Sequence, residues 1–184
     1  NLKKIFDIST DNTGAVKVTP IGEGASKFVV LFGHGTGTNS SAVVMPGKFA
    51  VHNYPEGTYT VTIKTYDIAG KESVNTYPLV IKYRAPENLV VNINSDMQLK
   101  AEATYAKSFL VDYGDGTTAT MTTSINASTS VATGTLPNHV YAAGGPYTLK
   151  VTAQSGGAAT TVYTKTLFGF PINFENAQVD YFFG

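Results

Sequence analysis

Short runs of apolar residues, many of them alternating with polar ones, recur along most of the chain, and this pattern predicts β-strands. The runs occupy residues 16–19, 28–32, 59–63, 77–83, 89–93, 99–103, 109–113, 147–151 and 161–164. Turn-forming pairs such as Glu56-Gly57 and Gly156-Gly157 separate them. No comparable run follows the spacing of a helix. The pattern therefore predicts an all-β protein.

The second half of the chain repeats the first. The run at residues 28–35 matches the run at 109–116, which begins 81 residues later, and each ends in a Gly-x-Gly turn. The His-x-Tyr triplet at 52–54 matches the one at 139–141, which begins 87 residues later. The larger displacement places a longer connection at residues 117–138, whose Thr, Ser and Ala content is typical of an exposed loop. A repeat of about 85 residues predicts two modules of one fold.

The repeat divides the chain into two modules and three shorter segments. The connection between the modules contains Pro86 and is too short to act as a free tether. We expect a lead-in at residues 1–14, a first β-sandwich at 15–84, a short linker at 85–88, a second β-sandwich at 89–168 and the start of a truncated third module at 169–184.

The spaced motifs of the repeat resemble those of the polycystic kidney disease (PKD) domain. In the second copy, the Gly-Asp-Gly turn at 114–116, the His-x-Tyr triplet at 139–141 and the Gly-Pro-Tyr strand start at 145–147 follow in the order typical of the family. The first copy carries His34 where the family usually has Asp. The resemblance implies two tandem immunoglobulin-like (PKD-like) β-sandwiches.

The segment at residues 167–176 is similar to segments that flank PKD-like modules in surface lipoproteins of Bacteroidetes polysaccharide-utilisation systems. The resemblance implies a surface glycan-binding protein of the outer membrane, attached only through a lipid anchor outside this chain. Its sandwiches would serve as a stalk or spacer for a C-terminal carbohydrate-binding module. We expect a monomer whose partner is a polysaccharide, with β-glucans among the candidates.

Two other functions stay open at this point. The chain can be an accessory region of a secreted glycoside hydrolase whose catalytic domain lies outside it. It can also be a protein–protein adhesion module, which would expose a large apolar patch.

Composition narrows the choice of partners. The chain has 184 residues, and its 13 acidic and 13 basic side chains give a formal net charge of zero. Nucleic acid is not an expected partner, because binding to phosphate groups needs a basic excess. The absence of cysteine excludes disulfides and cysteine-based metal or redox sites.

No set of residues in the sequence points to catalysis. Glycoside hydrolysis needs two carboxylates that face each other across a cleft, whereas the acids of this chain are scattered singly over turns. A nucleophilic serine would need a Gly-x-Ser-x-Gly elbow, which the chain lacks. We therefore expect no enzyme activity, no cofactor and no catalytic residue.

The histidines and the acidic turn residues favour a structural role. His52 and His139 each precede a Tyr by two residues at equivalent positions of the repeat. This pattern predicts a corner where the Tyr hydroxyl bonds to a backbone group and the His is satisfied beside it. For Asp112 and Asp115 we favour bonds to backbone amides of their turn, so no metal site is expected. A weak calcium site on these two carboxylates stays an alternative, although Ca²⁺ prefers more oxygen ligands.

Sugar binding without catalysis needs exposed aromatic rings beside polar groups on a rigid scaffold. The chain has no Trp, which counts against a strong platform. The candidate glycan contacts are Tyr66, Asp67 and Lys71, because they place an aromatic ring, an acid and a base around one turn. An ordinary solvent-exposed hairpin is the alternative at this position.

Overall fold

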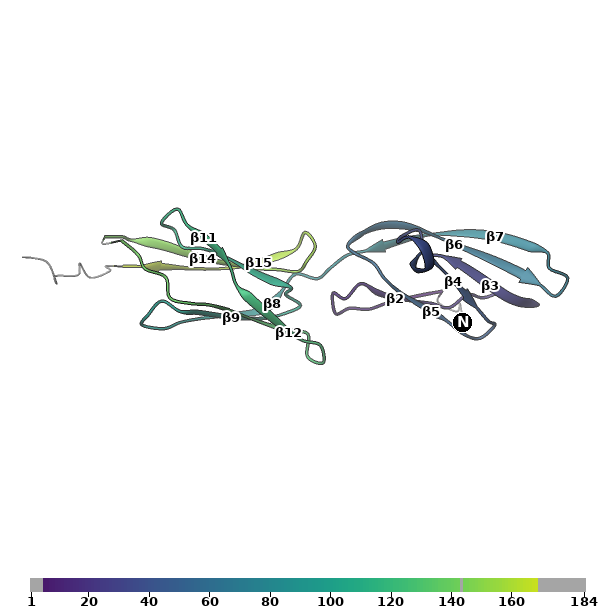
Figure 1. Cartoon of the computed structure of the whole chain (residues 1–184), viewed down its shortest axis with the longest axis horizontal. Coiled ribbons are helices and arrows are strands. Elements are labelled where there is room, and N and C mark those ends of the chain that lie inside the picture. The colour runs from purple at the N-terminus through teal and green to yellow at the C-terminus, as the bar shows by residue number, and fades with distance from the viewer. Residues whose placement is uncertain (1–4, 143, 169–184) are drawn as a thin grey trace, which may run out of the picture. The chain divides into compact units, whose positions relative to one another are not determined.

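The computed structural model describes residues 5–142 and 144–168, and it confirms the all-β prediction (Figure 1). Four antiparallel sheets pair into two β-sandwiches. The chain passes from the first compact unit to the second at Ala85 and Pro86. The expected third module at 169–184 lies outside the described residues.

Helical structure in the described residues is limited to one 3-10 turn, η1 (Gly37–Asn39). Consequently, this part of the chain contains no helix that could span a membrane.

The first sandwich pairs a three-stranded sheet with a four-stranded one. The three-stranded sheet has the order β1 (Phe6–Ile8), β2 (Ala15–Val18), β5 (Ala50–Asn53). The four-stranded sheet has the order β4 (Ser41–Val44), β3 (Ala25–Leu31), β6 (Gly57–Asp67), β7 (Glu72–Ile81). Strand β1 lies inside the segment expected as a lead-in, and its pairing with β2 sets Phe6 opposite Val18. The pairing of the first sheet therefore begins before residue 15.

The second sandwich consists of two four-stranded sheets. One has the order β12 (Thr122–Asn126), β13 (Val131–Leu136), β9 (Leu99–Thr104), β8 (Glu87–Ile93). The other has the order β11 (Thr118–Thr120), β10 (Ser108–Asp112), β14 (Tyr147–Gln154), β15 (Thr160–Leu167). Both sandwiches thus place the strand before the Gly-x-Gly turn, β3 or β10, next to the strand after the His-x-Tyr triplet, β6 or β14. The connections from β2 to β3 and from β9 to β10 pass from one sheet to the other, as in immunoglobulin-like folds.

The prediction of an exposed loop at residues 117–138 is wrong. This segment contains β11, β12 and β13, and β13 pairs along its whole length with β9. Thr is polar, but its β-branched side chain favours the extended backbone of a strand. Polarity alone is typical of a loop, but here the strand propensity of Thr and the pairing with β9 decide the structure.

Each sandwich buries apolar side chains between its two sheets. On β2, Val16 and Val18 are fully buried while Lys17 between them is exposed, and Phe109 and Val111 on β10 alternate in the same way. Burial of one such side chain contributes about 1.5–3 kcal/mol, so these strands are held mainly by their inward faces. The first core comprises Val16, Val18, Phe28, Val30, Phe32, Val44, Tyr54, Val61, Ile63, Leu79 and Ile81. The second comprises Met97, Leu99, Ala101, Ala103, Ala106, Phe109, Val111, Tyr113, Met121, Ala132, Tyr141, Leu149, Val151 and Ala153.

Pro78 interrupts an otherwise regular strand pattern and has a simple structural reason. It lies in β7, which is the outer strand of its sheet and pairs only with β6. A proline has no N–H to donate, so it is tolerated where one side of the strand has no neighbour to bond.

Gly134 makes room for the core of the second sandwich. It is a buried residue of β13, and a Cβ placed on it would lie 2.6 Å from Cδ2 of Phe109 and 2.8 Å from Sδ of Met121. The absence of a side chain at this position therefore allows the Phe109 ring to pack against the strand.

We expect Gly134→Ala to destabilise the second sandwich by about 1–3 kcal/mol, because the added methyl group overpacks the core. Chemical denaturation measures the change in the free energy of unfolding. Thr135→Ala, at an exposed position of the same strand, should stay within about 0.5 kcal/mol of the wild type. Equal effects of the two substitutions would contradict the packing role of Gly134.

Candidate functional site

In the first sandwich, a buried tyrosine connects two segments that lie far apart in the sequence. Tyr54 follows β5 and is 1% exposed. Its hydroxyl donates a 2.9 Å hydrogen bond to the carbonyl of Phe32, and its backbone N–H donates to the carbonyl of Gly14 at 2.9 Å. Burial, followed by the nearby Tyr59, raises the pKa of Tyr54 to about 12, so the phenol stays a donor at neutral pH.

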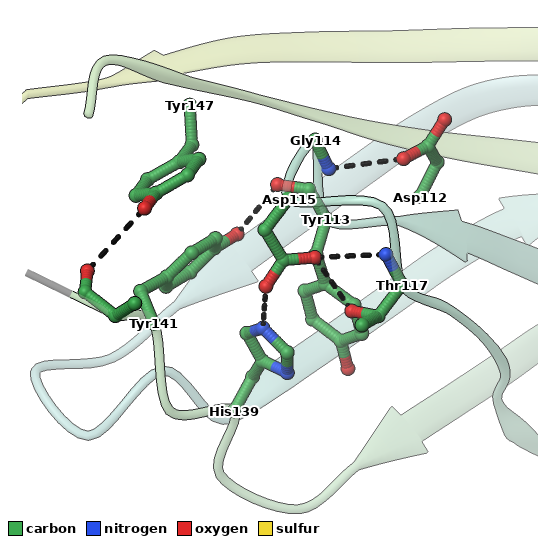
Figure 2. Close-up of polar contacts among 9 residues, drawn as sticks. Asp112, Tyr113, Gly114, Asp115, Thr117, His139, Tyr141 and Tyr147 are labelled. Atoms are coloured by element: carbon green, nitrogen blue, oxygen red, sulfur yellow. Dashed lines mark hydrogen bonds and ion pairs between the residues drawn. The ribbon is translucent and has the colours of Figure 1, made fainter. Parts of the chain in front are cut away.

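The second sandwich repeats this corner (Figure 2). The hydroxyl of Tyr141 donates a 3.0 Å hydrogen bond to the carbonyl of Tyr113, and its ring stacks on Tyr147 with 4.7 Å between centroids. Burial, and then the charge of Asp115, raises the pKa of Tyr141 to about 12. The prediction of a tyrosine corner with its hydroxyl on a backbone group is confirmed in both copies.

His139 lies beside this corner and is held on two sides. Its ring stacks on Tyr113 with centroids 3.7 Å apart, and its Nε2 is 2.7 Å from Oδ2 of Asp115. The two side chains are only 16% and 15% exposed. Figure 2 shows the carboxylate of Asp115 between His139 and Thr117. The predicted satisfied histidine is confirmed here as one half of an ion pair when it is protonated.

The acidic side chains of the Gly-Asp-Gly turn hold the turn itself, as the sequence predicts. Oδ1 of Asp115 accepts hydrogen bonds from the N–H of Thr117 at 2.9 Å and from its hydroxyl at 2.6 Å. Oδ1 of Asp112 accepts from the N–H of Gly114 at 2.9 Å. The bonds from Thr117, together with the one from His139, lower the pKa of Asp115 to about 2.

A glycine is required where each turn begins. Gly33 and Gly114 adopt φ angles of +67° and +79°, and a Cβ on either would lie 2.2 Å or 2.5 Å from the carbonyl oxygen of Thr60 or Thr148. These two threonines lie at matching positions of β6 and β14. The close approach of turn and strand therefore excludes a side chain at this position in both copies.

In the first sandwich, the equivalent histidine, His52, contacts a second histidine instead of a carboxylate. The His52 ring stacks on Phe32 with centroids 4.3 Å apart, and its Nε2 is 2.9 Å from Nδ1 of His34. Burial, followed by the proximity of His34, lowers the pKa of His52. This pairing was not predicted, although the repeat places His34 at the position of Asp115.

The candidate glycan contacts lie where β6 and β7 meet in a hairpin, but they do not form one surface. Tyr66 and Asp67 are neighbours on a strand, so their side chains leave on opposite faces. The Tyr66 hydroxyl donates to Oε2 of Glu72, and Nζ of Lys27 lies 5.0 Å from its ring centroid. Oδ1 of Asp67 instead accepts a 2.8 Å bond from the N–H of Lys71 and holds the turn.

Two of the three candidate contacts line a shallow hollow near this hairpin. Asp67 and Lys71 belong to its wall, together with Glu72, and its volume is about 230 Å³. Tyr66 does not line it. Ile68 lies in the turn of this hairpin and is 93% exposed, and it was not among the predicted glycan contacts. The hairpin therefore brings Tyr66 to Glu72 and separates its ring from Asp67 and Lys71, which lie together.

The described residues contain no group of three or more histidine and carboxylate side chains that could hold a metal ion. The polar groups of the two corners are used in bonds within each sandwich. The alternative calcium site at Asp112 and Asp115 therefore has no third histidine or carboxylate ligand among the described residues.

Comparison with known proteins gives little information on function. No protein-family model matches the sequence, and no curated protein matches it. A similar solved structure is described as "Biofilm associated protein - BSP domain". The two chains are 25% identical, the match covers 89% of this chain and 28% of that chain, and the TM-score is 0.31. The chain therefore spans little more than a quarter of the length of the chain that it matches.

The hydrogen bonds that Asp115 accepts from Thr117, together with its contact with His139, predict a stability that depends on pH. The folded state lowers the pKa of Asp115 from 3.8 to about 2, so the unfolded chain binds the proton more readily. The stabilisation is complete above pH 4 and is lost as the pH falls towards 2. We expect Asp115→Asn to lower the unfolding midpoint of the second sandwich above pH 4 and to match the wild type near pH 2.

Calorimetric unfolding between pH 2 and 7 measures this difference. Asp96→Asn is the control, because it removes the same charge from an exposed turn of the same sandwich. If the difference in unfolding midpoint between Asp115→Asn and the wild type stays constant from pH 7 to pH 2, the stabilising role of the Asp115 carboxylate is refuted.

Proposed function

We propose that the two sandwiches are the non-catalytic spacer of a cell-surface polysaccharide-binding protein. The observation that carries the proposal is that both copies build the same internal corner from a Tyr and a His, and the His contacts Asp115 in the second copy and His34 in the first. These are the residue types that catalysis would otherwise require. The two copies repeat one scaffold, and the polar side chains of its corner bond to each other and to the backbone. A spacer is expected to have this property.

The PKD-like assignment refines the proposal. The topology is compatible with it, and each copy has the Gly-x-Gly turn and the His-x-Tyr corner in the order typical of the family. On this basis we propose a surface glycan-binding lipoprotein of the Bacteroidetes outer membrane. Its lipid anchor and its C-terminal carbohydrate-binding module would both lie outside the described residues.

The geometry of the hairpin between β6 and β7 supports a division of roles in the longer parent protein that we propose. In it, the C-terminal carbohydrate-binding module, and not the two sandwiches, binds the glycan. The Tyr66 ring has Lys27 over one side and its hydroxyl is bonded to Glu72. A sugar would need that ring exposed beside polar groups that are not already engaged. The partner we propose is a neutral polysaccharide, such as a β-glucan, bound by the following module.

We expect this chain to show no measurable retardation in affinity gels that contain neutral polysaccharides, whereas the parent with its C-terminal module should be retarded. Tyr66→Ala tests the candidate contact directly, and Tyr105→Ala, which changes the same residue type in the other sandwich, is its control. Micromolar binding by this chain that Tyr66→Ala abolishes would make the first sandwich a recognition module and overturn the spacer proposal.

A spacer must also keep its two ends apart. We therefore expect a radius of gyration clearly above the value of about 16 Å for a compact protein of 184 residues. Small-angle X-ray scattering measures it. A radius near 16 Å would count against the spacer, even if the chain binds no glycan.

One observation favours protein–protein adhesion as a second candidate function. Four large apolar side chains are more than half exposed within nine residues of β4, β5 and their connection: Val43, Met45, Phe49 and Val51. Exposed apolar side chains that form one patch mark contact surfaces more often than isolated apolar residues do. Concentration-dependent self-association that Phe49→Ser removes would favour adhesion over the spacer.

A further inference from the structure

The corner of the first sandwich places two imidazole nitrogens face to face. Nδ1 of His34 and Nε2 of His52 are 2.9 Å apart, and the ring planes are inclined by 73°. Two neutral imidazoles form such a contact only if one nitrogen carries the shared proton and the other accepts it. The same separation is what one metal ion would require of two ligands at a right angle. Bonds of about 2.0–2.1 Å at a right angle set the two nitrogens about 2.9 Å apart.

The two rings are held in place by their neighbours. His52 stacks on Phe32, and its ring meets Tyr54 edge to face with centroids 4.6 Å apart. His34 lies 5.4 Å from the ring centroid of Tyr59. A metal site gains affinity when its ligands need little rearrangement, because less conformational freedom is lost on binding.

The surroundings of this pair are polar, open and free of charged side chains. Both histidines line a hollow of about 540 Å³, whose other walls are Gly35, Thr36, Asn39, Val51 and Asn53. Among these lining residues and the aromatic neighbours there is no carboxylate, lysine or arginine. The nitrogens therefore have no competing ion-pair partner there, and the hollow has room for water molecules that would complete the coordination of an ion.

We propose that His34 and His52 form a two-imidazole site for a divalent transition-metal ion of the Cu²⁺ or Ni²⁺ type. Imidazole suits these ions, and both favour tetragonal or square-planar coordination, in which neighbouring ligands subtend a right angle. Water would occupy the remaining positions. For both nitrogens to bind the ion, the ring that donates the shared proton must adopt its other tautomer, with the proton on its second nitrogen. Because only neutral imidazole binds a metal ion, binding should weaken as the pH falls.

The second sandwich provides an internal comparison. There Asp115 replaces His34, and its carboxylate is already bonded to Thr117 as well as to His139. That corner offers one imidazole, which is held by an acidic partner. The exchange of His for Asp at one repeat position thus distinguishes the proposed site from its structural equivalent.

The test is a titration of the full chain with Cu²⁺ at pH 7.4. Calorimetry measures the affinity and the number of bound ions, and electron paramagnetic resonance counts the coordinated imidazole nitrogens. The variants are His34→Asp, which copies the second corner, and His52→Gln. His139→Gln is the matched control in the other sandwich. Circular dichroism and unfolding midpoints establish that each variant folds. If His52→Gln does not fold, His34→Asp decides alone.

We expect one Cu²⁺ ion per chain with two imidazole nitrogens in the wild type and in His139→Gln. Either variant of the site should weaken binding by about tenfold or more, because two ligands held together bind more tightly than one. Binding of equal strength in all four proteins, or a wild-type spectrum with fewer than two imidazole nitrogens, would overturn the proposal and leave the contact as a hydrogen bond within the fold.

Discussion

The hydrogen bond from a buried tyrosine hydroxyl to the backbone at the end of a central strand organises each sandwich. Tyr54 donates to Phe32, and Tyr141 donates to Tyr113, so each His-x-Tyr triplet is joined to the residue that directly precedes the Gly-x-Gly turn. An unsatisfied hydroxyl in either core would cost about 1–3 kcal/mol. The nearby histidine packs beside this bond, because His52 and His139 stack on Phe32 and Tyr113, the residues whose carbonyls accept it.

The two corners satisfy the same geometry with different chemistry. In the second sandwich His139 faces a carboxylate, so protonation of the imidazole creates an ion pair with Asp115. In the first, His52 faces another imidazole, and protonation of both rings would remove the acceptor and bring like charges together. One residue difference between the repeats therefore changes the electrostatic behaviour of the corner while the stacking and the tyrosine bond stay the same.

The hairpin between β6 and β7 illustrates why residue types near a turn are weak predictors of a binding surface. Tyr66 faces its cross-strand neighbour Glu72, and Asp67 bonds to the backbone of its own turn. Strand alternation separates consecutive side chains, and turn formation uses polar atoms that a ligand would need. The exposure of Val43 and Val51 likewise depends on which face of β4 and β5 turns away from the core, and apolar residues alone do not reveal that face.

The sequence by itself determined the all-β class, the internal repeat and the tyrosine corners. Alternation along strands such as β2 and the positive φ required at Gly114 are local properties, and the repeat allowed two copies of one corner to be compared. Only the tertiary structure decided the pairing of β1 with β2, the strands within residues 117–138 and the space beside Gly134. It also decided that His34 meets His52. These features depend on contacts between segments distant in the chain, whose free energies no local pattern of residues encodes.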